Sequence, residues 1–429
     1  MTAPVSYLDE LAERRMAERS RSGPLLALRA NGSGRPVADE ENVRLILATD
    51  PALAGFVQHD DFSYELLLCK PIPGTDGGDD LPRRWRDEDT VNLQTYIQRD
   101  HIPRIGRDKV AGALKAYART SCVVHPLRDY LRGLRWDGTE RLDRLLIDYM
   151  GAEATPLHGE FGARWMISAV ARVMRPGCQA DYALVLEGPQ GIGKTSALRA
   201  LCPSDDYFSD SLPHDLASKD AKAHSVGKWI IELSELTQFR KSEIETVKGF
   251  LSRREEKFRP AYGRNEVIVP RQCVFAGTTN ESEYLVDSTG NRRFWCVAVS
   301  KVDVAAIERD RDQLWAEAAH RFDAGERWHL SPDMEREAAG EAAKRVTFDP
   351  LLVTVHSILK SGGRLGGKLE VTPSDILAQV EADVIPARER TPATGKRIGA
   401  LLLQLGWTKG RRVTRGQLFL RPDREVSLT

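Results

Sequence analysis

The stretch Leu184-Val-Leu-Glu-Gly-Pro-Gln-Gly-Ile-Gly-Lys-Thr-Ser-Ala-Leu198 joins a short apolar run to a glycine-rich turn and then to a helix-forming segment. Residues 188–195 fit the pattern G-x-x-x-x-G-K-[ST], in which a loop between a strand and a helix wraps nucleotide phosphates. Glycines let the backbone approach the phosphates and direct its N–H groups toward them. The pattern therefore predicts an ATP site with contacts from Gly188, Pro189, Gln190, Gly191, Ile192, Gly193, Lys194, Thr195 and Ser196.

Two side chains of this loop carry the chemistry. We expect Lys194 to reach the β- and γ-phosphates and the Thr195 hydroxyl to bind the Mg²⁺ that accompanies the nucleotide. A glycine-rich turn without function is the alternative interpretation. The strand-like run before the loop and the helical segment after it supply the context that a phosphate loop requires. ATP and Mg²⁺ are therefore the expected cofactors.

The composition limits the class of protein. The 429 residues are sufficient for two to four domains, and 62 Lys and Arg balance 62 Asp and Glu. Zero net charge argues neither for nor against nucleic acid, so local clusters of charge must decide. The six cysteines stand singly, without the paired spacing of a zinc site. No apolar run reaches the length of a membrane span and no signal-peptide core is visible, so we expect a soluble intracellular protein.

A second apolar run, Lys228-Trp-Ile-Ile-Glu-Leu-Ser-Glu-Leu236, predicts another central strand. Glu232 and Glu235 lie toward its carboxyl end, where open α/β sheets bind ligands. A carboxylate close to such an apolar strand is costly without a partner. We expect one of the two to bind Mg²⁺ or its water and the other to polarise the attacking water, and the sequence leaves open which does which. Two exposed acids in a loop are the alternative.

A third run, Gln272-Cys-Val-Phe-Ala-Gly-Thr-Thr-Asn280, ends in an amide that suits the attacking water and the γ-phosphate. Arg292 and Arg293 follow in Thr289-Gly-Asn-Arg-Arg-Phe-Trp295. An arginine supplied by a neighbouring subunit stabilises transition-state charge in many NTPases. We expect this role for the pair, and ordinary salt bridges are the alternative.

Two regions suggest contacts with nucleic acid. A helix over 242–254 carries Lys248, and the segments around Lys257 and Val269 predict a β-hairpin whose basic tip includes Arg259, Tyr262 and Arg264. Cations beside an aromatic ring suit a phosphate backbone and a stacked base. A hairpin with a solvated tip is the alternative.

The second region lies near the end of the chain. Helices over 372–380 and 394–405 precede an alternating segment over 407–420, which is the order of a winged-helix module. Residues 388–424 hold ten Lys and Arg against two acids, and such a stripe suits phosphate contacts. A winged helix that contacts only protein is the alternative. The expected DNA contacts here are Lys396, Arg397, Arg411, Arg412 and Arg415.

Taken together, the phosphate loop, Ile230-Ile-Glu-Leu-Ser-Glu235, Tyr262-Gly-Arg264, Gly277-Thr-Thr-Asn280 and Gly290-Asn-Arg-Arg-Phe-Trp295 resemble the virulence-associated E family. The upstream segments His125-Pro-Leu-Arg-Asp-Tyr-Leu131 and Arg172-Val-Met-Arg-Pro-Gly177 extend the resemblance to roughly residues 100–300. His125 itself is isolated from other candidate ligands, and we interpret it as a packing or capping residue. The family occurs in phages, prophages and pathogenicity islands and is similar to superfamily 3 helicases.

The resemblance implies an α/β fold with an AAA+-like P-loop NTPase core at 155–330. A helical region at 96–154 would precede the core, an accessory region of unknown role would occupy 1–95, and a winged-helix-like domain would occupy 331–429. Within the core, it implies that Glu232 and Glu235 form Walker B, Asn280 is sensor 1, and Arg293, with Arg292 as a possible second, is the finger. Lys248 and the hairpin would face a central channel. Many superfamily 3 members place the two Walker B acids side by side, whereas Leu233 and Ser234 separate them here.

The resemblance also implies partners and a location. It predicts a hexameric ring of identical subunits on single-stranded or forked DNA in the cytoplasm of a bacterial host cell, with a primase or other replication proteins nearby. The expected function is an ATP-driven helicase or translocase in mobile-element replication. The alternative is an initiator that binds DNA or a partner in an ATP-switched manner without unwinding. A kinase is disfavoured, because no acceptor site is visible beside the arginines and Asn280.

Overall fold

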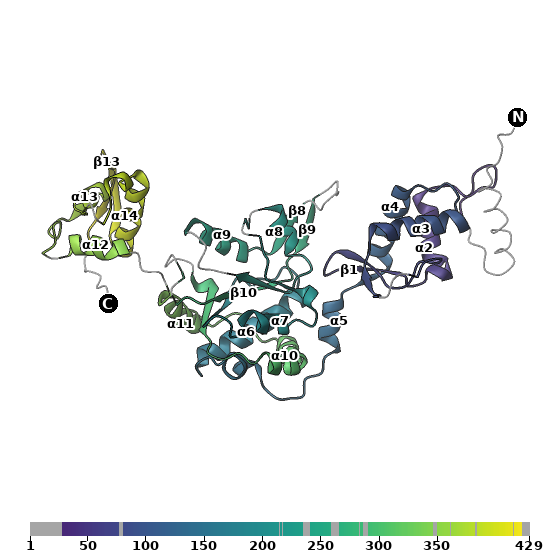
Figure 1. Cartoon of the computed structure of the whole chain (residues 1–429), viewed down its shortest axis with the longest axis horizontal. Helices are drawn as coiled ribbons and strands as arrows, with labels where there is room; N and C mark the ends of the chain where they lie inside the picture. The colour runs from purple at the N-terminus through teal and green to yellow at the C-terminus, as the bar shows by residue number, and fades with distance from the viewer. Residues whose placement is uncertain are drawn as a thin grey trace. The chain divides into compact units, whose positions relative to one another are not determined.

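The computed structural model describes residues 28–76, 80–213, 215–216, 218–234, 241–258, 266–282, 284–285, 291–345, 350–360, 362–381, 384–414 and 416–422. The chain divides into two compact units, whose elements are labelled in Figure 1. The larger unit comprises residues up to 282 together with 290–343, and the smaller comprises 283–289 with 344–429.

The first part of the larger unit is a small α/β body. Its elements are α2 (Glu40–Thr49), η1 (Pro51–Leu53), β1 (Val57–Asp60), β2 (Glu65–Leu68), β3 (Arg83–Arg84), α3 (Asp87–Asp100), α4 (Arg107–Ser121) and β4 (Val123–Val124). The sheet has the order β3-β2-β1-β4, with β1 antiparallel to β2 and parallel to β4. Val43, Leu93 and Leu114 are fully buried in its core. Helix α3 runs through residue 95, the expected end of the accessory region.

A helical segment follows this body. It comprises α5 (Pro126–Gly133), η2 (Leu142–Arg144), η3 (Leu145–Tyr149) and α6 (Pro156–Met174). His125 caps α5, because its Nδ1 accepts a hydrogen bond from the backbone N–H of Arg128 at 3.1 Å. Its Nε2 lies 2.8 Å from Oε1 of Gln272, so the same ring also contacts the core. The expected packing or capping role of His125 is confirmed.

Five short apolar strands form the central sheet. They are β5 (Ala183–Glu187), β6 (Phe208–Ser209), β7 (Ile230–Ser234), β10 (Val274–Thr279) and β11 (Phe294–Ala298). All neighbours run parallel, in the order β11-β5-β10-β7-β6. Near-continuous apolar sequences suit such strands, because parallel sheets are buried on both faces. This mixed α/β fold with an all-parallel sheet is consistent with the expected P-loop core, and it places β10 between β5 and β7.

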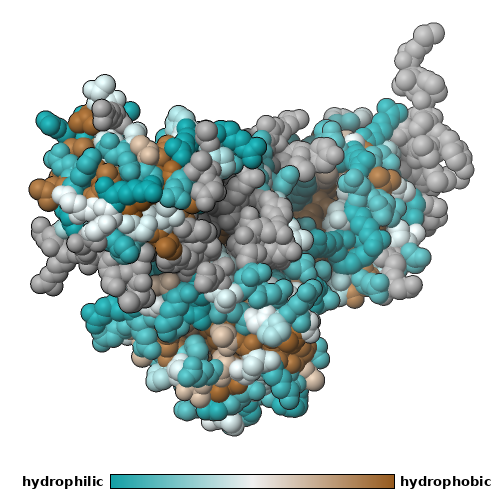
Figure 2. All heavy atoms as spheres, turned by 60° about the vertical axis from the view of Figure 1, so that its left-hand side comes forward, coloured by the Kyte–Doolittle hydropathy of each residue, from teal (hydrophilic) through white to brown (hydrophobic). Residues whose placement is uncertain are grey.

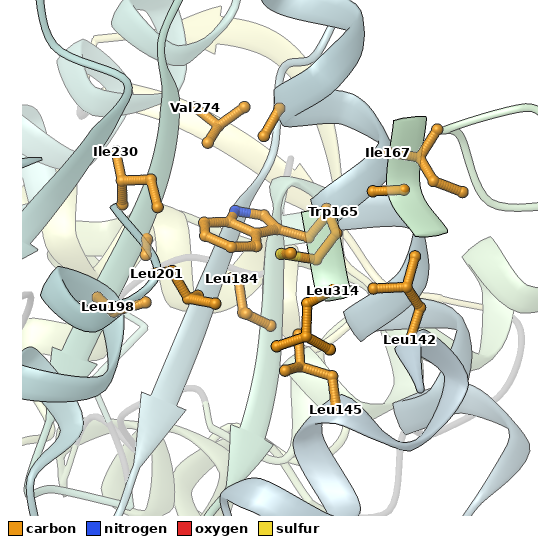
Figure 3. Close-up of a cluster of buried hydrophobic side chains, with 14 of the residues drawn as sticks. Leu142, Leu145, Trp165, Ile167, Leu184, Leu198, Leu201, Ile230, Val274 and Leu314 are labelled. Atoms are coloured by element: carbon orange, nitrogen blue, oxygen red, sulfur yellow. The ribbon is translucent and has the colours of Figure 1, made fainter. Parts of the chain in front are cut away.

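Helices cover both faces of this sheet (Figure 1). Against one face pack α6, α7 (Lys194–Ala200) and α10 (Val304–Asp323), and Trp165, Leu184 and Leu314 lie there in one hydrophobic cluster (Figure 3). On the other face, the ring of Phe250 from α9 (Lys241–Leu251) packs edge-on against Phe275, with 5.4 Å between centroids. The remaining elements are η4 (Asp205–Tyr207), α8 (Lys219–His224), β8 (Glu255–Phe258), β9 (Val267–Pro270), η6 (Asn291–Arg293) and α11 (Pro332–Ala343).

Three of these elements bear on the sequence predictions. Strands β8 and β9 pair antiparallel, as the hairpin prediction requires. Helix α11 belongs to the larger unit and packs on β11 and η6, although it lies beyond residue 330, the expected end of the core.

The smaller unit has its own sheet and core. Its elements are α12 (Pro350–Leu359), β12 (Glu370–Val371), α13 (Pro373–Leu377), η7 (Ala387–Glu389), α14 (Pro392–Gln404), β13 (Thr408–Val413) and β14 (Gly416–Leu420). The antiparallel sheet has the order β12-β14-β13. Thr372 and Asp375 form a capping box at α13, and Val355, Ile398 and Phe419 are buried. The order of two helices and a hairpin agrees with the prediction, and its assignment as a winged helix stays a prediction.

The helices and the surface of the described residues bear on the predicted absence of a membrane span. Among the described residues, no helix combines the length and apolar character needed to cross a bilayer. Hydrophilic residues predominate on the face drawn in Figure 2, where hydrophobic residues form smaller groups.

Candidate active site

The predicted phosphate loop lies between β5 and α7. Strand β5 ends at Glu187 and α7 begins at Lys194, so the loop occupies the carboxyl edge of the sheet. Gly193 has φ +95°, a left-handed conformation that favours glycine. A Cβ on Gly188 would lie 2.4 Å from the carbonyl oxygen of Val299, which leaves no room for a side chain. The glycines of the pattern are therefore required by the backbone of the loop itself.

Lys194 is held inside this loop. Its Nζ donates to the carbonyl oxygens of Gly188 at 2.7 Å and Pro189 at 2.8 Å, and to Oδ1 of Asn280 at 2.9 Å. Burial lowers the pKa of the Lys194 ammonium, and the nearby Glu232 carboxylate opposes this shift. The structure thus brings Lys194 and Asn280 together from α7 and the end of β10, as the predicted roles require.

Glu232 is the buried acid of the site. Its residue is 1% exposed, and its Oε1 accepts hydrogen bonds from the Thr195 hydroxyl at 2.9 Å and from the Thr278 hydroxyl. Burial raises the pKa of Glu232, the two hydroxyl donors lower it, and the nearby Asp210 raises it further. Its other oxygen, Oε2, is buried without a hydrogen-bond partner among the described residues.

This donor set fits Mg²⁺. The ion takes oxygen ligands and is commonly held by one or two carboxylates together with substrate phosphates and water. Oε2 of Glu232 has no partner within the part of the chain that the structure describes, and the Thr195 hydroxyl lies beside the same carboxylate. The described residues contain no cluster of three or more His, Cys, Asp or Glu side chains that could hold a metal alone. A magnesium ion here would therefore depend on the phosphate oxygens of a nucleotide.

Thr278 is a functional candidate that the sequence analysis missed. It lies on β10, two residues before Asn280, and donates its hydroxyl hydrogen to the Glu232 carboxylate across the boundary between β10 and β7. The signal that was available is the polar end of an otherwise apolar strand, Thr278-Thr279-Asn280. Which of these hydroxyls faces Glu232 depends on the strand order, which sequence patterns do not provide.

The two candidate finger arginines lie at the opposite edge of the sheet. Both belong to η6, which immediately precedes β11, and Phe294 of β11 pairs in parallel with Ala183 at the start of β5. At about 3.3 Å per strand residue, roughly 15–20 Å separates Arg293 from the phosphate loop of its own chain. The Nε of Arg293 donates to Oγ of Ser252 at 3.0 Å.

A polar hollow marks this amino edge. It has a volume of about 220 Å³. The residues that line it are Gln179, Asp181, Tyr182, Arg292, Arg293, Trp295, His329, Leu330 and Glu335. The rings of Tyr182 and Trp295 stack at 3.7 Å between centroids and form its wall. The arginines lie at the amino edge of the sheet and the phosphate loop lies at its carboxyl edge. A single chain therefore does not bring its own arginines to its own phosphate loop.

The structure describes only some of the other residues that were predicted to act in catalysis or to contact DNA. Glu235, Arg259, Tyr262, Arg264 and Arg415 lie outside the described residues. Lys248 is only 4% exposed, because α9 packs that part of its surface into the unit, so the structure does not present it to a DNA backbone. In the smaller unit, the exposed residues include Lys396, Arg397, Arg411 and Arg412.

Three solved structures that resemble the chain are distant likenesses. An A form apo structure of the NrS-1 C-terminal region is 14% identical, with 65% of this chain and 66% of that chain covered and a TM-score of 0.36. A further apo structure of the same region is 12% identical, with 68% and 77% covered and a TM-score of 0.37. Another A form apo structure is 14% identical, with the same coverage and a TM-score of 0.36. The chain spans about two thirds of the first of these, and such TM-scores are too low to show a shared fold.

Comparison with known sequences is more decisive. No curated protein matches the chain. Residues 131–347 match the virulence-associated protein E-like domain. This match covers half of the chain and contains the phosphate loop, Glu232, Asn280 and both arginines of η6. The chain therefore belongs to the virulence-associated protein E-like family.

Proposed function

We propose that this chain is an ATP-dependent DNA helicase or translocase of mobile-element replication, which hydrolyses ATP between the subunits of a ring. The observation that carries the proposal is the separation of two sets of groups. Lys194, Glu232 and Asn280 converge at the carboxyl edge of the sheet, whereas Arg293 lies at the amino edge. A complete hydrolysis site then needs the carboxyl edge of one copy and the amino edge of the next.

The residues of the carboxyl edge divide the work of hydrolysis. Lys194 binds the β- and γ-phosphates in exchange for the carbonyl oxygens that it contacts now. Thr195 and Glu232 would hold Mg²⁺, which when bound neutralises charge on the phosphates. Asn280, next to Lys194, orients the attacking water and contacts the γ-phosphate. Thr278 fixes the Glu232 carboxylate in the orientation that this arrangement needs.

The neighbouring copy supplies positive charge during the reaction. An arginine finger stabilises the charge that develops in the transition state and increases turnover roughly 10³–10⁵-fold. A head-to-tail contact that repeats around an axis closes into a ring, and each interface then contains one phosphate loop and one Arg293. We propose a hexamer as the closed form.

DNA is the proposed partner that the ring moves along. The exposed cations of the smaller unit, Lys396, Arg397, Arg411 and Arg412, support contacts with phosphates. The β8–β9 hairpin supports a second contact, at the segment that joins its strands.

ATPase and unwinding assays test this proposal together. We expect ATP hydrolysis that single-stranded DNA stimulates and displacement of one strand from a forked substrate. Lys194→Ala is expected to abolish both, whereas Lys219→Ala, which changes an exposed lysine of α8, leaves both intact. ATP-dependent DNA binding without strand displacement would instead support an initiator. Transfer of phosphate to an acceptor other than water would support a kinase.

A further inference from the structure

Ser252 connects the end of α9 to the candidate finger. It directly follows α9, and its hydroxyl donates to the carbonyl oxygen of Lys248 at 2.9 Å. Oγ of Ser252 in turn accepts a hydrogen bond from Nε of Arg293 at 3.0 Å, although the two residues lie 41 positions apart in the sequence. A serine hydroxyl has a single hydrogen to donate. Because the helix end takes that hydrogen, the oxygen lone pair is directed toward the guanidinium.

The geometry leaves Arg293 equipped to bind phosphate. The bond to Ser252 uses Nε of Arg293 and does not use its two terminal amino groups. These two groups can donate parallel hydrogen bonds to two oxygens of one phosphate. Arg293 is half-buried and lines the hollow at the amino edge, whereas its neighbour Arg292 is exposed. The contact with Ser252 therefore distinguishes Arg293 from Arg292 and restricts a long side chain that would otherwise sample many rotamers.

We propose that Ser252 is a positioning residue for Arg293, and that it holds the guanidinium at the angle at which it enters the active site of the next subunit. This inference rests on the proposed function, because it assumes that Arg293 acts on ATP bound by a neighbour. Ser252 itself does not contact ATP. Loss of the Ser252 hydroxyl changes the alignment of the Arg293 guanidinium, which acts in the transition state. Small displacements of such a group reduce the reaction rate strongly.

Steady-state ATPase kinetics of Ser252 variants test this role. In Ser252→Ala, we expect kcat to fall about 10- to 100-fold while the KM for ATP stays near the wild-type value, because the lost contact acts in the transition state. Ser252→Thr keeps the hydroxyl and should restore most of kcat. Ser225→Ala is the matched control, since Ser225 also donates to a backbone carbonyl at a helix end, that of Lys222 at 2.9 Å. An unchanged kcat in Ser252→Ala would overturn the inference.

Mixing subunits separates misalignment from misfolding. Ser252→Ala subunits keep their phosphate loops, and Lys194→Ala subunits keep a correctly held Arg293. A 1:1 mixture should recover about a quarter of wild-type turnover, because random assembly pairs one intact loop with one intact finger at that fraction of interfaces. A mixture of Arg293→Ala and Lys194→Ala subunits serves as the reference. If this reference mixture recovers turnover and the Ser252→Ala mixture does not, the role of Ser252 is overturned and the proposed function stays intact. Absence of recovery in both mixtures would remove the shared site, and with it both proposals.

Discussion

The two edges of the central sheet differ in what their polar groups contact. At the carboxyl edge, Lys194, Thr195, Glu232 and Asn280 bond to one another and to the loop backbone, so this half of the site is assembled within one chain. At the amino edge, Arg293 is held by Ser252 and lines a hollow of about 220 Å³. Parallel strands keep these groups apart, because the start of β11 lies beside the start of β5. Under the proposed function, nucleotide binding is therefore a property of one chain and hydrolysis a property of two.

The largest expected effect separates these two properties. Arg293→Ala should reduce ATPase turnover roughly 10³–10⁵-fold, because it removes charge stabilisation from the transition state. Binding of a fluorescent ATP analogue should remain, since the carboxyl edge is unaltered. Arg254→Ala provides the matched control, because Arg254 also donates through Nε, to the carbonyl of Gly177 at 2.8 Å, and it should keep turnover. Loss of analogue binding in Arg293→Ala would show that the two edges do not act separately.

The next effect concerns the support of Glu232 at the carboxyl edge. Thr278→Val removes the hydroxyl donor from the carboxylate and keeps the shape of the side chain. Loss of a group that orients a metal ligand costs about 10- to 100-fold in metal affinity or activity. We expect a loss of this size in Mg²⁺-dependent turnover, measured by titrating Mg²⁺, and recovery in Thr278→Ser. Equal turnover in Thr278→Val and wild type would remove Thr278 from the site.

A smaller effect concerns stability at the same edge. Burial raises the pKa of Glu232 above its ordinary value of 4.5, so the folded protein holds this proton more tightly than the unfolded chain. The stabilisation from that proton is present below about pH 4.5 and is lost as the pH rises through the folded-state pKa.

Glu232→Gln tests this stability effect, because glutamine does not titrate. The variant should lose turnover yet raise the free energy of unfolding at neutral pH by on the order of 1 kcal/mol. In denaturant titrations, the gain over wild type should grow as the pH rises from about 4.5 through the folded-state pKa of Glu232. A gain that shrinks over this range would contradict the raised pKa.

The smallest effect concerns the smaller unit, which contains neither edge of the central sheet. Arg411→Ala and Arg412→Ala change exposed cations of β13. Each should reduce the slope of log affinity for DNA against log salt by about one, with ATP turnover in the absence of DNA unchanged. Filter binding at several salt concentrations measures the slope. A change in DNA-free turnover would show that this unit acts on the active site directly.

The sequence predicts the parts of the site that a local pattern encodes. The phosphate loop is recognisable because its chemistry fixes residue types at fixed spacing, and the strands before Glu232 and Asn280 are recognisable as apolar runs. The interpretation of His125 also agrees with the structure, because a residue before Pro126 at a helix start is a local signal. Lys248 shows the limit of such patterns, since the helix was predicted correctly but the side chain is buried.

The features of the site that the sequence does not predict depend on the order of the strands and on contacts between residues far apart in the chain. The positions of Arg292 and Arg293 at the amino edge follow from the pairing of β11 with β5, which no local pattern specifies. Thr278 and Ser252 were missed because their partners lie 46 and 41 residues away and a hydroxyl carries no distinctive signal. The pairing of the small sheet in the first body was not predicted, because strands of two to four residues are too short to show a period.

Mixed-subunit turnover tests the central claim most directly. Lys194→Ala and Arg293→Ala subunits are each expected to be inactive alone, the first for lack of a working phosphate loop and the second for lack of a finger. If the site is shared between subunits, a 1:1 mixture should recover about a quarter of wild-type ATPase activity, because some interfaces then combine an intact loop with an intact Arg293. A mixture as inactive as its two components would contradict a site divided between the two edges.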